Sequence, residues 1–193
     1  MNKNIISNNQ KERFFQKIDS MLTDQMIVVA DIGECLFGAS ELTVSYHHFI
    51  SPAFYCSMGF AIPSALGVSF AKPNLRPVVL VGDGAFQMSA TELSTILTHN
   101  LNPIIFVLNN HGYTTERFIL DGTFNDIRDW QYHKITEMLS GGQGAKVDTE
   151  EELEEVIDKA LKSTSLFIIN VCVNSKDTST VLQRTVQNLS KKV

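Results

Sequence analysis

The sequence is poor in cysteine and in positive charge, and it has no long hydrophobic run. Its three cysteines, Cys35, Cys56 and Cys172, are odd in number and include no Cys-x-x-Cys pair. This argues against a disulfide framework or a zinc site and fits a reducing, cytoplasmic compartment. The net charge of -5 argues against a nucleic-acid partner. No apolar run reaches membrane-spanning length, so we expect no membrane association.

What is present fits one folded domain. The chain has 193 residues, of which 44% are hydrophobic and 19% are charged. A chain of this size and composition can bury a sizeable core. The first residues, 1–10, are polar and rich in asparagine, and we assign them to a leader. Residues 11–193 are predicted to form the domain.

Apolar runs and helical patterns alternate along this domain. We expect strands at 26–31, 76–84, 102–110 and 166–173, with a loop over 140–147 entering a further short strand. Helical spacing is expected at 11–22, 58–71, 86–100, 129–139 and 178–192. Thr149 and Glu152 have the spacing of a capping box, which predicts the start of another helix. Solid apolar strands that alternate with helices predict an α/β fold with a doubly wound, mainly parallel sheet and helices on both faces.

Two polar motifs follow two of the predicted strands. One strand ends on Gly82-Asp83-Gly84, and Asn109-Asn110 follows the next strand after a 24-residue spacer, 85–108. Ligands of such sheets bind at the carboxyl ends of the strands, so the two motifs can meet there. The glycines allow close approach of the backbone to a ligand. A helix beginning near Phe86 would offer free amides to an anion.

Asp83 would repel that anion unless a cation lay between them. One carboxylate together with amide and carbonyl oxygens is a ligand set suited to Mg2+ that holds a polyphosphate. The alternative is that Asp83 caps a helix and that the asparagines form a turn. The presence of both motifs at predicted strand ends favours the metal site.

The Gly-Asp-Gly motif, its 24-residue spacer and the Asn-Asn pair resemble the cofactor motif of thiamine-diphosphate enzymes. Longer stretches are similar to the C-terminal cofactor domain of 2-keto acid decarboxylases of the indolepyruvate, phenylpyruvate and pyruvate type. These stretches are ADIGECLFGASEL (30–42), SMGF (57–60), GDGAFQMSATEL (82–93), LNNHGYTTER (108–117) and FNDIRDW (124–130). The resemblance extends over about 11–189 and covers one domain of a multidomain family.

The resemblance implies a role for each matching residue. Mg2+ would be held by the Asp83 carboxylate, the Asn110 side chain and the Gly112 carbonyl. Met58 would lie between the two rings of the cofactor, and Glu116 would relay a proton at the reacting carbon. The remaining implied cofactor contacts are Cys35, the Cys56 carbonyl, Ser57, the amides of Gly84 and Ala85, Tyr113, Thr114 and Thr115. A solvated Glu116 paired with Arg117 is the alternative for that residue.

Two positions depart from the family pattern. Gly33-Glu34-Cys35 stands where the family often has Gly-Thr-Ser, and Ala85 replaces a serine that is common after Gly-Asp-Gly. A carboxylate at position 34 would repel a diphosphate, so we expect Glu34 to turn away or to bind another group. Neither change touches the implied metal ligands.

Two functions follow from the resemblance. The first is the thiamine-diphosphate- and Mg2+-binding domain of an enzyme that converts a 2-keto acid to an aldehyde and CO2. The second is a catalytically incomplete fragment, or a subunit of a split enzyme, that is inactive without a partner domain binding the pyrimidine end of the cofactor. A homo-oligomer is expected in either case.

Overall fold

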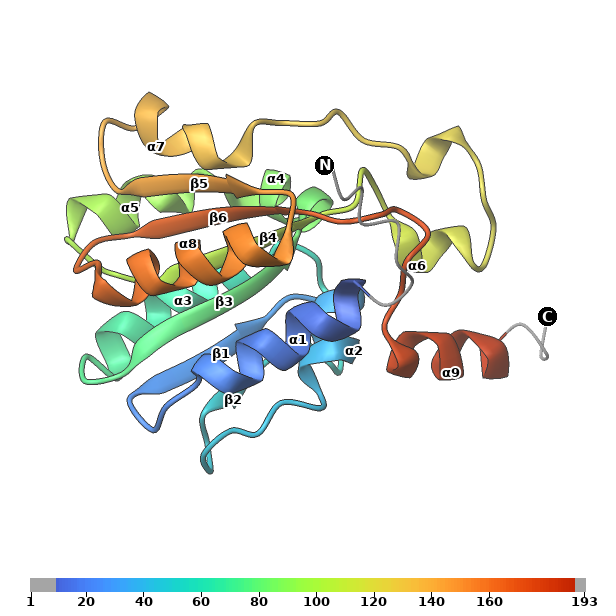
Figure 1. Cartoon of the computed structure of the whole chain (residues 1–193), viewed down its shortest axis with the longest axis horizontal. Coiled ribbons are helices and arrows are strands. Elements are labelled where there is room, and N and C mark those ends of the chain that lie inside the picture. The colour runs from blue at the N-terminus through green and yellow to red at the C-terminus, as the bar shows by residue number, and fades with distance from the viewer. Residues whose placement is uncertain (1–9, 190–193) are drawn as a thin grey trace.

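Figure 1 shows the computed structural model of the chain, which describes residues 10–189. Residues 1–9 of the predicted leader and residues 190–193 of the predicted domain lie outside the described residues. The strands are β1 Met26–Ala30, β2 Phe49–Ile50, β3 Arg76–Gly82, β4 Ile104–Asn109, β5 Gln143–Val147 and β6 Phe167–Cys172. The helices are α1 Gln10–Met21, α2 Glu34–Ala39, α3 Ala61–Ala71, α4 Asp83–Ser89, α5 Glu92–Thr98, α6 Thr114–Arg117, α7 Ile135–Met138, α8 Glu150–Lys162 and α9 Thr180–Leu189, with 3-10 turns η1 Thr123–Asn125 and η2 Tyr132–Lys134.

The described strands form one six-stranded sheet in the order β2-β1-β3-β4-β6-β5. Every pairing is parallel. Alternate residues of β3 point to opposite faces, and all five from Pro77 to Val81 are buried. A strand covered on both faces must be apolar at every position, which explains the solid apolar runs.

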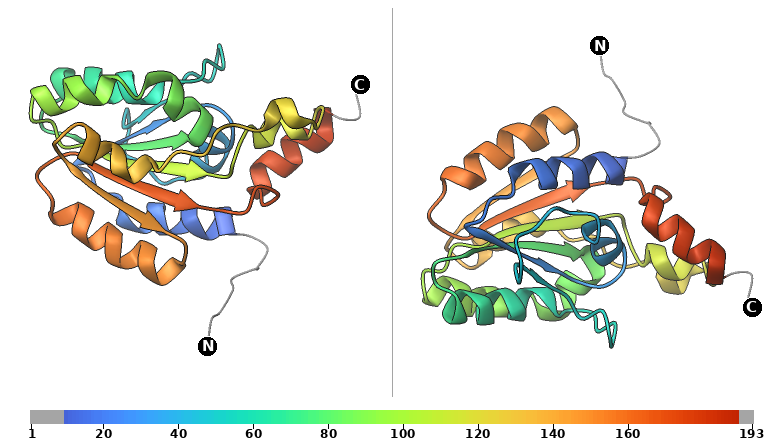
Figure 2. Two further views of the ribbon diagram at one scale, coloured as in Figure 1. Left: turned by 90° about the horizontal axis from the view of Figure 1, so that it is seen from above. Right: turned by 90° about the horizontal axis from the view of Figure 1, so that it is seen from below.

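Helices cover both faces of the sheet, as the two turned views show (Figure 2). The first face packs against α1, α2 and α8, and the second against α3, α4 and α5. Val78 and Leu80 of β3 belong to the first core, and Val79 and Val81 belong to the second. The predicted α/β fold with a doubly wound parallel sheet is confirmed.

Local predictions were confirmed in part. Pro63 lies in the first turn of α3, and Thr149 and Glu152 form the capping box that begins α8. The single helix predicted over 86–100 is wrong: the structure has two helices, α4 and α5, and α4 begins at Asp83. Hydrogen bonds of the i to i+3 type span the junction between them, from the Leu93 amide to the Ala90 carbonyl for example.

The helix predicted over 129–139 is largely wrong. Only η2 and the short α7 are helical there. Tyr132 is buried, its ring packs edge-on against Phe86 at 5.3 Å, and Gln87 donates to its hydroxyl. Tertiary packing of Tyr132 therefore fixes this segment across the second face in place of a regular helix.

The loops of interest lie at the carboxyl edge of the sheet. The chain runs from β1 to β2 on one side and β3 lies on the other side of β1. Such a reversal of strand order opens a crevice between the carboxyl ends of the two strands. Among the described residues no helix is long and apolar enough to cross a membrane.

Candidate functional site

A cavity of about 250 Å³ lies at the carboxyl ends of β1, β3 and β4. Its walls come from the loops after β1 (32–35), β3 (82–85) and β4 (110–116), with residues 56 and 58 closing one side. The predicted site residues that line it are Cys35, Cys56, Met58, Asp83, Gly84, Ala85, Asn110, Gly112, Tyr113, Thr114, Thr115 and Glu116. Ser57 is exposed and does not line the cavity. Four separate stretches of sequence thus meet where the strand order reverses.

Asp83 lies at the floor of this cavity, and its side chain is buried. Its Oδ1 accepts the Gly84 amide at 2.8 Å, while its Oδ2 accepts the amides of Asn110 at 3.2 Å and Gly112 at 3.0 Å. Gly82 is the N-cap of α4, so the alternative that Asp83 caps the helix is wrong. An ionised carboxylate has about four acceptor positions. Each of the two oxygens is thus already hydrogen-bonded to at least one backbone amide.

Burial is the main cause of an unusual protonation equilibrium at Asp83. It raises the pKa of the carboxyl to about 6, against the partial compensation of the backbone amides. Burying an ionised carboxylate lowers folding stability, so the presence of Asp83 here is better explained by ligand binding. A bound cation would offset the cost by favouring the ionised form.

Asn110 supplies the oxygen that a metal at this position needs. Its side chain is 6% exposed, and its Oδ1 is buried without a hydrogen-bond partner. The Gly112 carbonyl accepts the Thr114 amide and keeps a second lone pair. Asp83, Asn110 and Gly112 therefore offer hard oxygen ligands, which fit Mg2+. The described residues contain no cluster of three or more His, Cys, Asp and Glu that could hold a metal, as expected for a site with one carboxylate.

Asn109 points to a different partner from Asn110. Its Nδ2 donates to Asp129 at 3.0 Å, which ties the end of β4 to the segment before η2. The resemblance implied a ligand role for Asn110 and none for Asn109, and the structure gives Asn109 this separate partner.

Gly112 has a conformation that excludes a side chain. Its φ is +138°, and a Cβ at this position would lie 2.1 Å from the Asn125 carbonyl oxygen. Arg117 holds the facing segment by pairing with Asp126 and with Asp121 at 3.0 Å. The alternative in which Glu116 pairs with Arg117 is not what the structure shows, because Arg117 forms these two pairs instead. The loop that carries the predicted metal ligand is fixed from both sides.

We predict that Gly112→Ala destabilises the protein by on the order of 2–4 kcal/mol, because overlap with backbone is added to an unfavourable φ. Mg2+-dependent ligand binding should fall with it, since the carbonyl of residue 112 would move. Gly67→Ala is the matched control, because a Cβ at Gly67 in α3 meets nothing within 4 Å. Alanine favours a helix there, so the control should keep or raise stability. Urea unfolding of the two variants measures the difference, and equal stabilities would contradict the argument.

Most residues predicted to contact the rings and the diphosphate line the cavity around Asp83 and Asn110. Cys56 has φ +58°, a left-handed conformation that glycine adopts with less strain. Met58 is 37% exposed at the cavity wall. Cys35 is buried, and burial raises the pKa of its thiol well above the ordinary value, so it is no thiolate. The Gly84 amide, expected to face a diphosphate, donates to Asp83.

Glu116 lies in α6, and its side chain is exposed while it lines the cavity. The large apolar side chains that follow it, Phe118, Ile119 and Leu120, are 42%, 59% and 66% exposed. Apolar side chains of the kind expected around Glu116 are therefore present, but they are exposed to solvent.

Glu34 lines the cavity, although the sequence identified it only as a departure from the family pattern. It is 6% exposed, lines the cavity and accepts the Ser179 amide on its Oε1 at 2.8 Å. The Lys11 ammonium lies 3.8 Å from its Oε2. The expectation that Glu34 binds another group is confirmed. Its partners come from the two ends of the chain, so no local sequence signal could have identified them.

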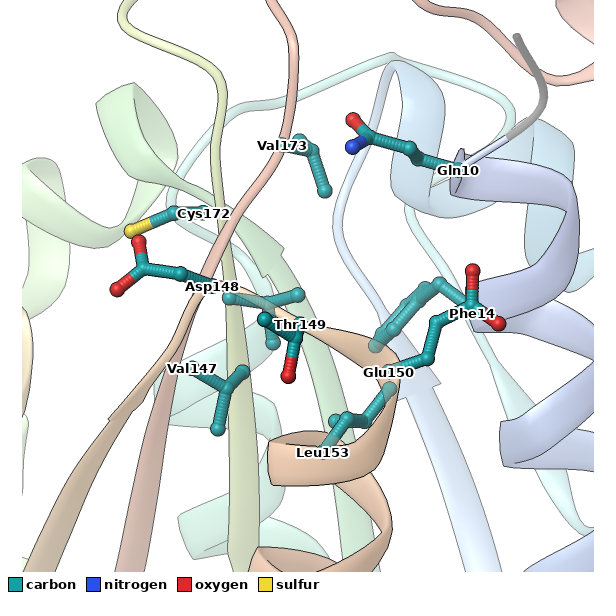
Figure 3. A pocket seen from close by; sticks show the side chains of 10 residues that line it. Gln10, Phe14, Val147, Asp148, Thr149, Glu150, Leu153, Cys172 and Val173 are labelled. Atoms are coloured by element: carbon teal, nitrogen blue, oxygen red, sulfur yellow. The ribbon is translucent and has the colours of Figure 1, made fainter. Parts of the chain in front are cut away.

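A second, smaller cavity lies between α1, β6 and the start of α8 (Figure 3). Its volume is about 40 Å³, which is room for water and not for a cofactor. Cys172 lies beside it, and burial raises the pKa of this thiol to about 12. This cavity therefore offers neither a reactive thiolate nor a set of unpaired ligands.

The sequence matches the family model described as thiamine pyrophosphate enzyme, C-terminal TPP binding domain, over residues 31–171. The chain belongs to this family. The matched segment begins at the end of β1 and runs through β6, so it contains every loop of the cavity. The family's thiamine pyrophosphate-binding function agrees with the motif found in the sequence.

Curated relatives of this thiamine pyrophosphate-binding domain include plant enzymes. Pyruvate decarboxylase 2 of Pisum sativum is 37% identical over 175 residues, which are 86% of this chain and 42% of that protein. Pyruvate decarboxylase 3 of Arabidopsis thaliana is 36% identical over 86% of this chain and 29% of its own length. The chain therefore spans less than half the length of these relatives.

Proposed function

We propose that this chain is the diphosphate- and metal-binding domain of a non-oxidative 2-keto acid decarboxylase. Such an enzyme converts a 2-keto acid to an aldehyde and CO2 with thiamine diphosphate and Mg2+. Membership of the thiamine pyrophosphate-binding family and the similarity to pyruvate decarboxylases support this proposal.

Two oxygen-bearing side chains at the cavity floor are the main support for the proposed Mg2+ site. The buried Asn110 Oδ1 has no hydrogen-bond partner, and it lines the same cavity as a buried carboxylate, Asp83. An unpaired buried acceptor costs on the order of 1–3 kcal/mol. A cation that binds both groups would remove that cost, and the adjoining loops offer space for the diphosphate it would hold.

Different residues of this chain have different proposed roles around the cofactor. Thiamine diphosphate, when bound, supplies the carbanion-stabilising chemistry of decarboxylation. Asp83, Asn110 and the Gly112 carbonyl hold Mg2+, and Met58 orients the rings. Glu116 would relay a proton to the carbon that loses CO2.

A partner domain is part of the proposal, because the cavity is incomplete. Its volume of about 250 Å³ is below the roughly 300 Å³ at which small-molecule pockets begin. Phe54 and Tyr55, next to Cys56, are 97% and 83% exposed. We infer that a pyrimidine-binding domain or subunit covers this side, within a homo-oligomer. The same exposed aromatic side chains also favour the second candidate, a catalytically incomplete fragment or a subunit of a split enzyme.

Calorimetry of the 193-residue chain tests the proposed function. Thiamine diphosphate should bind with Mg2+ present and should fail to bind when EDTA removes the metal. Thiamine, which has no diphosphate, should not bind in either case. Binding that ignores Mg2+, or the absence of any binding, would contradict the proposal.

Glu116→Gln should separate cofactor binding from turnover. Since Glu116 is not a metal ligand, the variant should bind thiamine diphosphate within about twofold of the unmodified chain. In an enzyme assembled with the partner domain, aldehyde release should fall by roughly 100-fold or more, as for loss of a general acid or base. Glu137→Gln in α7, an exposed glutamate outside the cavity, is the control and should change neither quantity. A parallel loss of binding and turnover would show that Glu116 has a structural role.

A further inference from the structure

Two opposite charges are buried together beside the cofactor cavity. Lys11, in the first turn of α1, is fully buried, and its ammonium lies 3.8 Å from the Oε2 of Glu34 at the start of α2. The same ammonium donates to the Asp177 carbonyl. Lys11 is the only Lys or Arg classed as buried among the described residues.

Glu34 is the member of the pair that reaches the cavity. It lines the same space as Asp83 and Gly84. Its Oε1 is used by the Ser179 amide, and its Oε2 is buried with no hydrogen-bond partner. A carboxylate in this place, if unpaired, would add a negative charge where a polyanion has to bind.

The positive charge of Lys11 is surrounded by acidic groups. Desolvation lowers the pKa of Lys11, while Glu34, Asp177, Cys35 and Asp83 act in the opposite direction. The ammonium therefore lies among acidic groups, although it comes from a helix far away in the sequence from Glu34 and Asp83.

Structural stability alone is a weak reason for this pair. Burying two charges costs several kcal/mol per ion, and apolar residues of similar volume are often as stabilising or more so. A buried pair at the wall of an anion site has a second effect, because it sets the electrostatic potential inside the cavity.

We propose that Lys11 is a positioning residue of the diphosphate site, whose buried ammonium neutralises Glu34 and so permits a diphosphate to bind beside that carboxylate. The inference rests on the proposed function, since it needs a diphosphate in the cavity. It assigns a role to α1, which precedes the segment matched by the family model.

The experiment compares four proteins: the unmodified chain, Lys11→Met, Glu34→Gln and the double variant. The probes are inorganic pyrophosphate and thiamine diphosphate, each with Mg2+, and affinities are measured by calorimetry. Lys11→Met leaves Glu34 unpaired and should weaken both probes by at least about tenfold. Glu34→Gln keeps an oxygen for the Ser179 amide and should bind both probes as tightly as the unmodified chain, or several-fold more tightly. The double variant should recover the affinity lost in Lys11→Met to within about threefold.

The pair Lys17–Glu154 provides matched controls. Lys17 is on the same helix, its ammonium lies 2.8 Å from Glu154 of α8, and both side chains are partly exposed outside the cavity. Lys17→Met and Glu154→Gln make the same charge changes and should leave both affinities unchanged. Melting temperatures of all variants show whether an affinity change follows a loss of folding. If Lys11→Met does not fold, Glu34→Gln and the double variant still decide the outcome.

Several outcomes would overturn the proposed role of Lys11. Weaker binding in Glu34→Gln, or no recovery in the double variant, overturns the inference. So does unchanged binding in Lys11→Met. If the Lys11–Glu34 pair has only a structural role, its loss should lower the melting temperature without tightening pyrophosphate binding in any variant. A Glu34→Gln variant that binds less tightly than the unmodified chain would indicate such a role. Failure of the unmodified chain to bind either probe would overturn the proposed function itself, which separates the two failures.

Discussion

Asp83→Asn is expected to abolish Mg2+-dependent binding of thiamine diphosphate to this chain. Asp83 is the only charged group among the proposed ligands, and three amides already use part of its acceptor capacity. A neutral amide at this position would leave Mg2+ with no anionic protein ligand, which hard divalent cations require in most sites. Calorimetry should show an affinity at least about 100-fold lower, which corresponds to a loss of about 2.7 kcal/mol or more in binding free energy.

The same substitution should change how folding stability depends on pH in the metal-free protein. Burial raises the pKa of Asp83 to about 6 from an ordinary value of 3.8. Between these values the folded state binds more protons than the unfolded state, so stability falls as the pH rises through this window. The loss is complete above about pH 6 and amounts to roughly 3 kcal/mol for a shift of about two units.

Asp83→Asn removes this titration, so the variant should lose about 3 kcal/mol less stability than the unmodified chain between pH 4 and pH 7. Asp31 and Glu34, whose pKa values burial also raises, remain in both proteins and cancel in the comparison. The exposed Asp148, paired with Lys146 at 2.9 Å, provides the control Asp148→Asn. Urea unfolding across this pH range measures the difference. Parallel pH curves for the Asp83 variant and the unmodified chain, or retained Mg2+-dependent binding, would refute the assignment.

The sheet and the main motifs were predictable because their causes are local. Strands such as β3 and β4 each contain five consecutive apolar residues, 77–81 and 104–108, so their existence does not depend on tertiary detail. The Thr149 capping box and the position of Pro63 follow from backbone hydrogen bonding within one turn. Asp83 and Asn110 could be brought together because both follow parallel strands that are neighbours in the sheet.

What could not be predicted depends on partners distant in the sequence. The segment 129–139 has helical spacing, yet packing of Tyr132 on Phe86 determines its course. Glu34 gave only the expectation of another partner, because that partner, Lys11, is 23 residues away in a different helix. The short helices α2 and α6 and the two-residue strand β2 are held by such contacts and have no pattern long enough to read.

The 193-residue chain by itself should not decarboxylate a 2-keto acid at an enzymatic rate. The resemblance to 2-keto acid decarboxylases implies that a glutamate of another domain activates the pyrimidine end of the cofactor. No residue of this chain matches that glutamate. The cavity of about 250 Å³ is lined by the proposed metal ligands and Glu116, while Phe54, Tyr55 and Met58 are exposed in the described residues.

Exposure of that side weakens the chemistry as well as the binding. Electrostatic stabilisation of a reacting group depends on excluding water, because the effective dielectric constant rises where solvent enters. Glu116 itself is exposed, so water reaches the carboxyl group that would relay the proton. We propose that a second domain packed against residues 54–58 and 116–120 would exclude water from both.

The assay uses the full chain with thiamine diphosphate, Mg2+ and pyruvate, phenylpyruvate or indolepyruvate, and it measures aldehyde. We expect turnover at least about a thousandfold below the roughly 10 s⁻¹ typical of enzymes, even under conditions where calorimetry shows the cofactor bound. An intact 2-keto acid decarboxylase in the same assay is the positive control. Native mass should show self-association, because exposed aromatic patches favour contact between copies, and replacing Phe54 and Tyr55 by serine should reduce it. Aldehyde production near the enzymatic range by this chain alone would mean that the activating base lies within it, and would remove the need for a partner domain from the proposed function.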